Sequence, residues 1–522
     1  MTSKLVSHPT IKIHKQENLA LSWQVMVFAI LLALFAALRV WRITTFSLWG
    51  GEAFSMIGVQ QAWRDMFAYI VADIVHPPLF YILLKLWIMA GGDSLLWLKL
   101  FPVLPGIAVV VPFLLLCREL KFQLKEINLS LLLLAFNGYM IHYAQELRMY
   151  SLFTFLAMLS FWLFIRLYNS KGGVAGQLAL LTIINLLAIY THYYGWVVVG
   201  VEFLFLLIWQ RRRVLAYSLS MLFLFLCFSP WAYLVVREAL AIGGLEKNLD
   251  WIPKPGLTSI LNLYVTFNGP LGPRYLRIFG LLLFGLPLLL WIWRLFRAGF
   301  STQREELVRS SWLIILAFLP VISLFLISQV SDEPVWIDRY FIFIAIPYFM
   351  LISSAVNRVN PFWLRNIWIA ALVVLSILAG LNDMRTNRMA WEGPQLGSRI
   401  NWNVLVQHMA AAEADSSGPI NVYTLTVISK GLRTGDWAIS TSLDYFFDSL
   451  GEEKFQTVYV RDTKALLDQA EEDYFWVGFF ELEEWPQPSP STILANNGFH
   501  VGQELVVQEQ NNRLVLLPVR RK

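Results

Sequence analysis

Long apolar runs separated by short polar connections fill most of the chain up to residue 382. A bilayer core is about 30 Å thick, so an α-helix needs about 20 apolar residues to cross it. The pattern predicts a polytopic all-α membrane domain of about 11 transmembrane helices over 22–382, after a cytoplasmic N-terminal segment, 1–21. The runs lie at approximately 22–41, 97–117, 127–143, 147–167, 176–191, 193–210, 214–235, 275–296, 311–329, 339–356 and 363–382.

The pattern changes after residue 382. Four stretches are short and alternating or apolar, as strands are: PINVYTLTVIS, FQTVYVRD, DYFWVGFFELE and NRLVLLPV. KALLDQAEED is typical of a helix, and GDW, PQPSPS and NNG of turns. We therefore expect residues 383–522 to form a small soluble α/β domain.

One further apolar run, 77–90, is only 14 residues long and determines the topology. If it lies in the interface, every basic cluster between the spans falls on the cytoplasmic side, as the positive-inside rule requires. If it spans, all of these clusters move outside. The first interpretation places a first outer loop at 43–96, a long outer loop at 237–274 and the C-terminal domain outside the cytoplasm.

Composition and charge agree with this division. The chain is 57% hydrophobic and has a mean hydropathy of +0.56. Residues 1–382 contain 29 Lys and Arg against 17 Asp and Glu, a net charge of +12, and residues 383–522 contain 12 against 19, a net charge of −7. We attribute the basic residues to membrane topology, so no nucleic acid is expected as a partner.

Five stretches place polar residues at the outer membrane boundary: SLWGGEAFS (47–55), HPPLFYILLKLW (76–87), HYAQELRMYSL (142–152), YTHYYGWVVV (190–199) and WIDRYFIFIAIP (336–347). Ionisable groups there are costly unless they are solvated or paired, so the cluster indicates a site. An interfacial turn, a surface helix, a local Glu–Arg pair or an aromatic belt would each explain one stretch alone.

Cofactor motifs are missing from the sequence. It contains no Walker loop, no GxGxxG after a strand and no HExxH. His76, His142 and His192 share the outer face, but their spacing forms no local metal motif, so a divalent cation stays an open alternative.

Together and in this order, WGGEAFS, HPPLFY, YAQELRMY, THYYG and DRYF resemble motifs of the GT-C glycosyltransferases. The resemblance covers about residues 20–380 and is to bacterial relatives of dolichyl-phosphate-mannose protein mannosyltransferases and of aminoarabinose lipid A transferases. It implies a hexosyl or pentosyl transferase that takes its sugar from a polyprenyl phosphate in the bilayer. The acceptor would be a hydroxyl group on a lipid, a glycan or a protein, and the enzyme would lie in a bacterial plasma membrane.

The resemblance also implies roles for individual residues. A carboxylate of the first outer loop, Glu52 or Asp73, would act as general base in an inverting transfer. Cations would stabilise the phosphate leaving group; the candidates are Arg148, Arg339 and, more weakly, Lys85. The substrate pocket would be lined by His76, Tyr81, Gln145, Glu146, Tyr150, His192 and Tyr193.

The sequence departs from the family pattern at one position. The family's Asp-Glu pair usually places the base at the Asp, and here that residue is Gly51. Three explanations stay open. Glu52 takes over the role of the base, or Asp73 or Glu146 serves as the base instead, or the protein is slow or inactive. Because of Gly51, a non-catalytic protein that binds lipid-phosphate sugars is a second possible function. A transporter is a third, which the absence of sequence repeats disfavours.

Overall fold

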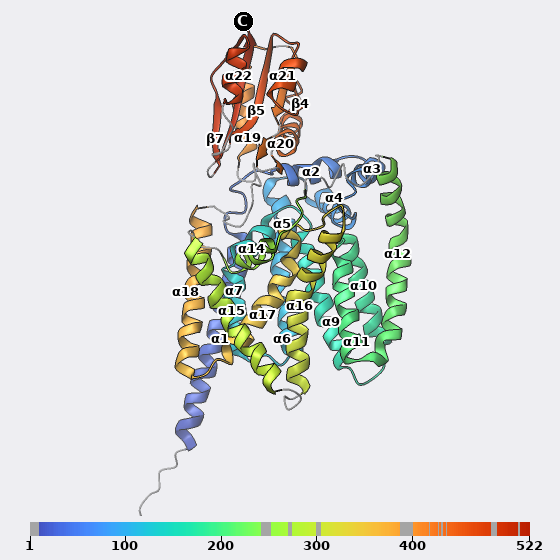
Figure 1. Cartoon of the computed structure of the whole chain (residues 1–522), viewed down its shortest axis with the longest axis vertical. Helices are drawn as coiled ribbons and strands as arrows, with labels where there is room; N and C mark the ends of the chain where they lie inside the picture. Colours follow the sequence, from blue (N-terminus) through green and yellow to red (C-terminus); the bar gives the residue numbers. More distant parts are fainter. Residues whose placement is uncertain are drawn as a thin grey trace, which may run out of the picture.

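The computed structural model describes residues 10–241, 252–269, 274–298, 304–386, 400–416, 418–425, 427–429, 432–434, 436–481, 488–509 and 512–522. Its helices form one thick layer, and the C-terminal domain stands on one side of that layer (Figure 1). We call this side the domain face; it carries α2, α3 and α4. The opposite side, here called the arginine face, carries the turn from α11 to α12, the end of α15 and the start of α16 (Figure 1). Arg211–Arg213 form this turn, Arg294 lies near the end of α15, and Arg309 lies near the start of α16. Arg358 follows α17 and binds Glu126 together with Arg309.

The helices of the membrane domain follow one another with short connections. Their bounds are α1 Thr10–Val40, α2 Gly50–Gln60, α3 Trp63–Asp73, α4 Leu79–Gly91, α5 Leu95–Ala108, α6 Val110–Glu119, α7 Leu124–Ala135, α8 Gly138–Gln145, α9 Tyr150–Asn169, α10 Ala175–Thr191, α11 Gly195–Trp209, α12 Val214–Ala241, α14 Leu257–Phe267, α15 Arg274–Ala298, α16 Arg304–Val330, α17 Ile342–Asn357 and α18 Phe362–Thr386, with short 3₁₀ helices η1 Arg211–Arg213 and η3 Asp338–Phe341.

The prediction of an all-α membrane protein with a small α/β domain is confirmed. Within the described residues, eight helices or continuous helix pairs are long and apolar enough to cross a membrane. The pair α7 and α8, bent by 61°, adds a ninth span. The shorter apolar helices α10 and α11 match the two remaining predicted runs. Run 77–90 forms the 13-residue α4, which lies with α2 and α3 on the domain face (Figure 1).

The core of the layer is α17, in which all 16 residues are buried. Its sequence, IFIAIPYFMLISSAVN, is apolar on every side over its first three turns, which is typical of a helix surrounded by others. Helices α7, α9, α15 and α16 pack around it. Because α17 follows directly from η3, this rigid helix fixes the position of the DRYF motif on the domain face.

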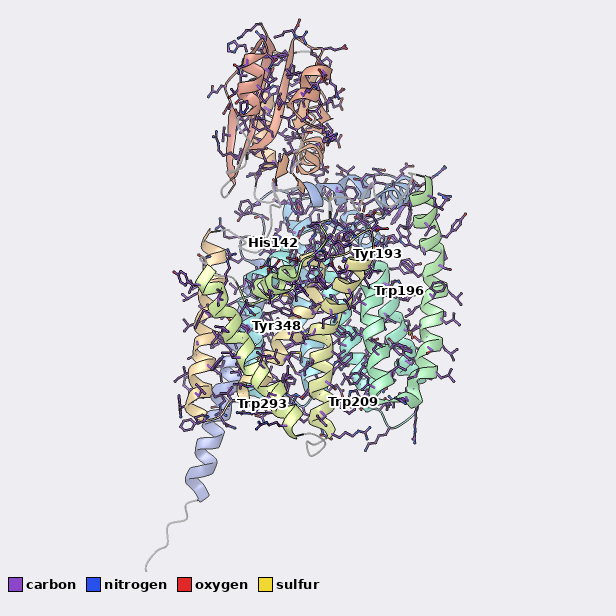
Figure 2. The ribbon with its side chains drawn as sticks, viewed as in Figure 1. His142, Tyr193, Trp196, Trp209, Trp293 and Tyr348 are labelled. Atoms are coloured by element: carbon purple, nitrogen blue, oxygen red, sulfur yellow. The ribbon has the colours of Figure 1, made fainter. Side chains whose placement is uncertain are left out.

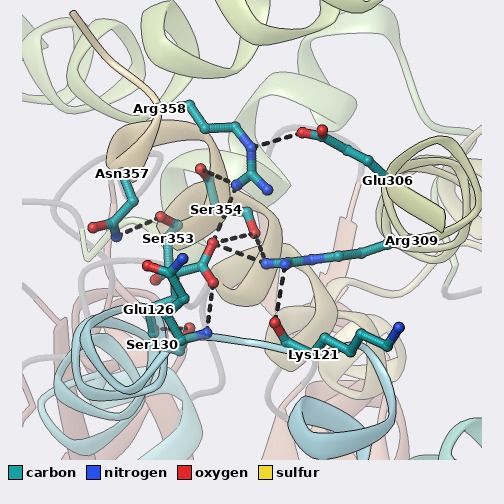
Figure 3. Close-up of polar contacts among 10 residues, drawn as sticks. Lys121, Glu126, Ser130, Glu306, Arg309, Ser353, Ser354, Asn357 and Arg358 are labelled. Atoms are coloured by element: carbon teal, nitrogen blue, oxygen red, sulfur yellow. Dashed lines mark hydrogen bonds and ion pairs between the residues drawn. The ribbon is translucent and has the colours of Figure 1, made fainter. Parts of the chain in front are cut away.

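An ion-pair cluster on the arginine face joins α7, α16 and α17 (Figure 3). Glu126 caps the start of α7, where its Oε2 accepts a hydrogen bond from the Gln123 amide at 2.8 Å. Its Oε1 lies 2.8 Å from Arg309 Nη2 and 3.1 Å from Arg358 Nη1. Shared by two guanidinium groups, the buried carboxylate is well compensated, so this end of the layer is firmly held.

The C-terminal domain contains one mixed sheet of six strands in the order β4-β1-β5-β8-β6, with β7 also paired to β8. β1 runs parallel to β4 and β5, and β8 runs antiparallel to β5, β6 and β7. The bounds are α19 Trp402–Ala412, β1 Ile420–Leu425, β2 Val427–Ser429, β3 Leu432–Thr434, α20 Asp436–Ser449, β4 Phe455–Val460, α21 Thr463–Gln469, β5 Tyr474–Glu481, α22 Pro490–Asn496, β6 Phe499–Val501, β7 Leu505–Glu509 and β8 Asn512–Arg521.

This domain is joined to the first outer loop. Helix α20 packs on α2, as Figure 1 also shows. The hydroxyl of Ser47 donates to the carbonyl of Ile400 at 3.0 Å and accepts from the amide of Trp402 at 2.9 Å. The loop that carries SLWGGEAFS therefore lies between the membrane layer and the domain. Of the predicted long outer loop, 242–251 and 270–273 lie outside the described residues, as do 387–399 of the predicted tail.

Candidate active site

The site is assembled on the domain face from segments far apart in sequence. They are the start of α2, the loop between α3 and α4, the loop between α8 and α9, the turn between α10 and α11, and η3. Figure 2 shows His142 and Tyr193 at this end of the layer, whereas Trp209 and Trp293 lie at the opposite end. The five sequence stretches therefore meet on one face, as the topology requires.

Glu52 is buried, with 1% of its surface exposed, and its carboxylate has three partners. Oε1 lies 2.5 Å from Lys99 Nζ and accepts from the Leu147 amide at 2.6 Å. Oε2 accepts from the Trp49 amide at 3.2 Å and so caps the start of α2. These partners tie three segments, α2, α5 and the loop after α8, to one carboxylate.

Gly51 sits where its backbone is in close contact with neighbours. Its carbonyl accepts from Arg148 Nη1 at 2.9 Å and from the Ser55 hydroxyl at 3.3 Å. A Cβ at this position would lie 2.8 Å from the indole ring of Trp49, closer than real Cβ atoms approach. The site therefore has no room for an aspartate at 51 unless Trp49 moves.

Asp73, His76 and Arg148 form a hydrogen-bonded chain. Asp73 Oδ2 lies 3.0 Å from His76 Nδ1, and His76 Nε2 lies 3.2 Å from Arg148 Nη2. A guanidinium group only donates, so Nε2 accepts and the proton of the neutral ring is on Nδ1, where it is donated to Asp73. Burial and the charge of Arg148 lower the pKa of His76 to about 4, which keeps the ring neutral.

Tyrosine rings surround the two arginines of the site. Tyr150 and Tyr340 have ring centroids 6.1 Å apart, and Tyr340 also lies 4.5 Å from the His192 ring. The Arg339 guanidinium carbon is 5.7 Å from the centroid of Tyr340. Arg148 is buried, with 6% exposed. Two cations in an aromatic, water-poor environment form a strong site for an anion.

The hydroxyl of Tyr81 and Nε2 of His192 are buried in this cluster and have no hydrogen-bond partner among the described residues. The other nitrogen of His192 accepts from the Tyr194 amide at 3.1 Å. Buried polar atoms are rarely left unpaired, so these two are available to a ligand. Both were expected from the sequence to line the substrate pocket, which stays a prediction.

Other predicted residues make contacts with the protein itself. Lys85 Nζ donates to the carbonyls of Val59 and Gln61 at 2.7 and 2.6 Å, near the end of α2. Gln145 Nε2 donates to the carbonyls of Arg39 and Trp41, both at 3.0 Å, at the end of α1. With these contacts the two side chains hold the framework of the outer loops.

Tyr193 and Glu146 complete the predicted set. The Tyr193 hydroxyl donates to the Ile74 carbonyl at 3.1 Å and accepts from Trp231 Nε1 at 3.2 Å, which holds the loop before His76. Glu146 is buried, and its Oε2 lies 3.6 Å from His142 Nε2.

Sequence reasoning missed Lys99, Ser55 and Tyr340. Lys99 lies inside a predicted span, where a lone cation was a signal for a buried partner. Ser55 Oγ accepts from Arg148 Nη1 at 3.1 Å, and nothing local in the sequence announces it. Tyr340 belongs to the DRYF motif but was not chosen as a site residue.

The described residues show no ready-made metal site. Among them, no group of three or more His, Cys, Asp or Glu side chains is placed to hold a metal ion. His76 is bonded to Asp73 and Arg148, and His142 is next to Glu146, so the three outer histidines have separate partners.

Solved structures with the same fold exist. The chain is similar to ArnT from Cupriavidus metallidurans in the apo state, with a TM-score of 0.54 and 14% identity over 96% of this chain and 98% of the other. For the same protein bound to undecaprenyl phosphate, the TM-score is 0.53 and the identity 14%, over 95% of this chain and 98% of the other. A third structure is the archaeal oligosaccharyltransferase AglB from Archaeoglobus fulgidus in complex with an inhibitory peptide and a dolichol-phosphate. Its TM-score is 0.51 and its identity 12%, over 94% of this chain and 74% of the other.

No protein-family model and no curated protein sequence matches the chain. At 12–14% identity, the structural likeness establishes the fold and leaves the activity to be argued from the site. ArnT and AglB are GT-C glycosyltransferases, and both cover nearly all of this chain. The resemblance expected from the sequence is therefore confirmed for architecture: the chain has the GT-C fold, an integral membrane layer with a small α/β domain on one face.

Proposed function

We propose that the protein is a membrane glycosyltransferase that moves a hexose or pentose from a polyprenyl-phosphate donor to a hydroxyl acceptor, with inversion. The observation that carries the proposal is the buried chain Asp73–His76–Arg148 beside the tyrosine-lined Arg339. It places a carboxylate and two cations together at the membrane boundary. ArnT and AglB, which share the fold, were solved with undecaprenyl phosphate and dolichol-phosphate, so the donor class has a structural precedent.

Arg148 and Arg339 are the proposed phosphate ligands. The donor phosphate carries one negative charge while the sugar is attached and gains a second when the sugar leaves. Cations already fixed in a water-poor site stabilise that developing charge without reorganisation. Arg148 is held by Gly51, Ser55 and His76, which leaves part of its fork of five N–H donors for a phosphate oxygen.

Asp73 is the proposed general base, in preference to Glu52. A base must come within about 3 Å of the proton it removes. The side chain of Asp73 is 20% exposed, whereas that of Glu52 is 1% exposed and has three partners. We assign Glu52 a positioning role: it fixes the loop before Arg148 through the Leu147 amide.

The transfer then balances as a single displacement. The acceptor oxygen forms a bond to the anomeric carbon as its proton passes to Asp73. The bond between that carbon and the phosphate oxygen breaks on the opposite face, and its electron pair leaves with the polyprenyl phosphate. His76 donates from Nδ1 to Asp73 and so fixes the carboxylate before the acceptor binds.

The proposed location is a bacterial plasma membrane, with the domain face outside the cytoplasm. Support comes from the arginine face, because basic loops stay on the cytoplasmic side. The lipid bilayer and the lipid-linked donor are the partners implied by this placement; a lipid, glycan or protein supplies the acceptor hydroxyl. The neutral His76 and its neighbours need no metal or other cofactor for the step as written.

A second candidate function is a non-catalytic protein that binds lipid-phosphate sugars. Gly51 favours it, because the position has no carboxylate and could hold one only if the Trp49 ring moved. The two functions are separated by transfer of radiolabelled sugar from undecaprenyl- or dolichyl-phosphate donors by the purified protein in the presence of membrane extract. Consumption of the donor supports the enzyme. Donor binding without any consumption contradicts it and favours the binder.

A further inference from the structure

A polar hollow of about 280 Å³ lies between the C-terminal domain and the membrane layer. One wall comes from the loop before α2 and from the start of α5, and the other from α19 and α20. It is lined by Thr44, Ser47, Leu48, Asp93, Leu95, Leu98, Asn401, Asn403, Tyr445, Phe446 and Ser449. Small-ligand sites measure about 300–1,000 Å³, so this hollow suits a group no larger than one or two rings.

The lining combines hydroxyl and amide groups with two aromatic rings. Thr44 offers a hydroxyl that donates and accepts hydrogen bonds, and the two asparagines, Asn401 and Asn403, offer both functions at separate atoms. The hydroxyls of Ser47 and Ser449 also line the hollow, but they already donate to backbone carbonyls. The side-chain oxygen of Asn403 has no hydrogen-bond partner among the described residues. Polar groups beside leucine and aromatic side chains suit a molecule with many hydroxyls and a partly apolar face.

The charge of the hollow distinguishes it from the phosphate site. Its only charged lining residue is Asp93, among residues that the structure describes, and no Lys or Arg contributes to the lining. Burial, together with the charges of Asp93, Asp448 and Glu52, raises the pKa of Tyr445 to about 12. An acidic field of this kind repels phosphate and accepts neutral or cationic groups.

We propose that this hollow is a subsite for a neutral or amino sugar unit of the acceptor, held between the C-terminal domain and the first outer loop. The inference rests on the proposed function, because it assigns the acceptor class. Leu48 and Leu98 line the hollow and precede Trp49 and Lys99, which bind Glu52. The sugar unit bound here is remote from the reacting hydroxyl and contributes to acceptor affinity.

The test uses the full chain in lipid nanodiscs, because maltoside detergents carry a sugar. Ligand-observed NMR with glucose, mannose and N-acetylglucosamine as probes is compared for the wild type, Tyr445→Phe and Asp93→Asn. Each variant keeps the shape of its side chain. Tyr459→Phe, an exposed tyrosine on β4 of the same domain, is the matched control.

We expect at least one of the three sugars to bind, and its dissociation constant to rise about 3- to 10-fold in each hollow variant, as for one lost hydrogen bond. The control variant Tyr459→Phe should bind that sugar with the same dissociation constant as the wild type. Absence of binding by all three sugars, or equal binding in every variant, overturns the proposal. Binding of a serine tripeptide that the same variants weaken, with no sugar bound, also overturns it in favour of a peptide acceptor.

Two readouts separate this inference from the proposed function. Binding of undecaprenyl phosphate should be unchanged in both hollow variants, because the donor site is elsewhere. If sugar transfer occurs and the variants leave the acceptor KM unchanged, the hollow is not the subsite although the enzyme stands. If sugars bind in the hollow but no donor is consumed, the hollow is a sugar-binding site, whereas the proposed transfer and the acceptor role fail.

Discussion

Lys99 Nζ and Glu52 Oε1 lie 2.5 Å apart in the interior, between residues that are 47 positions apart in sequence. Both side chains are less than one tenth exposed, so each charge depends on the other for compensation. The pair joins α2 to α5. Glu52, one of the two carboxylates that the resemblance offered as the base, thus helps to hold the framework.

Glu52→Gln should destabilise the protein by about 3–5 kcal/mol, because it leaves the Lys99 ammonium buried without its counter-ion. Lys99→Met should have a similar effect on the carboxylate. The double variant should recover most of the loss, since both charges are then gone. Thermal unfolding in nanodiscs measures the stability of the wild type, the two single variants and the double variant. If the stability losses of the single variants simply added up in the double variant, the pairing would be contradicted.

Asp73→Asn should lower kcat by about 10²- to 10⁴-fold, the usual contribution of a general base. The asparagine oxygen can still accept from His76 Nδ1, so the fold and the donor KM should hardly change. Asp65→Asn is the matched control, because Asp65 is an exposed carboxylate on the same helix, α3. A variant with wild-type kcat would exclude Asp73 as the base.

Arg148→Lys should weaken binding of undecaprenyl phosphate about 10- to 100-fold, because an ammonium group cannot reproduce the fork that contacts Gly51, Ser55 and His76. Arg64→Lys, an exposed arginine near the start of α3, serves as control. Unaltered lipid binding in Arg148→Lys would remove Arg148 from the phosphate site.

Gly51→Ala should lower the unfolding temperature, although alanine usually stabilises a helix relative to glycine by up to about 1 kcal/mol. The reason is the approach of the new Cβ to the Trp49 ring. Gly176→Ala, where nothing lies within 4 Å of the added atom, should be neutral or stabilising. Gly51→Asp should likewise fail to raise the transfer rate, and a faster Gly51→Asp enzyme would contradict the packing argument.

The His76 pKa makes stability depend on pH. The folded protein keeps this ring neutral down to about pH 4, whereas the unfolded chain protonates it at its ordinary value near 6.5. The unfolded state therefore binds more protons between these values, and stability falls as the pH is lowered from 6.5 to 4. The difference amounts to about 3 kcal/mol. His76→Gln should remove that part of the pH dependence, as unfolding midpoints at pH 4.5 and 7 would show.

The membrane helices could be predicted because apolar run length and the positive-inside rule act locally. Four strands of the C-terminal domain were predicted from short stretches that alternate apolar and polar residues or are apolar throughout. Helix α20 was missed, although it is the element that contacts α2. Its sequence, DWAISTSLDYFFDS, has no clear helical period of apolar residues. Its apolar residues can be understood only from the domain core and the outer loop against which the helix packs.

The site was predictable as a set of motifs but not as a set of contacts. Gathering Asp73, His76 and Arg148 on one face followed from topology. Which carboxylate is enclosed depends on partners distant in sequence: Lys99 and the Leu147 amide bind Glu52 across 47 and 95 positions. No local pattern records such pairings, so the sequence left Glu52 and Asp73 as alternatives for the base, and the preference for Asp73 is our proposal.

The most direct test of this account is sugar transfer by two variants, side by side, from a radiolabelled polyprenyl-phosphate donor. Asp73→Asn should bind the donor and transfer nothing measurable above about 1% of the wild-type rate, as removal of a general base requires. The double variant Glu52→Gln with Lys99→Met should retain transfer, because Glu52 only positions the loop. An active Asp73→Asn together with an inactive, folded double variant would show that Glu52 is the base and contradict the account.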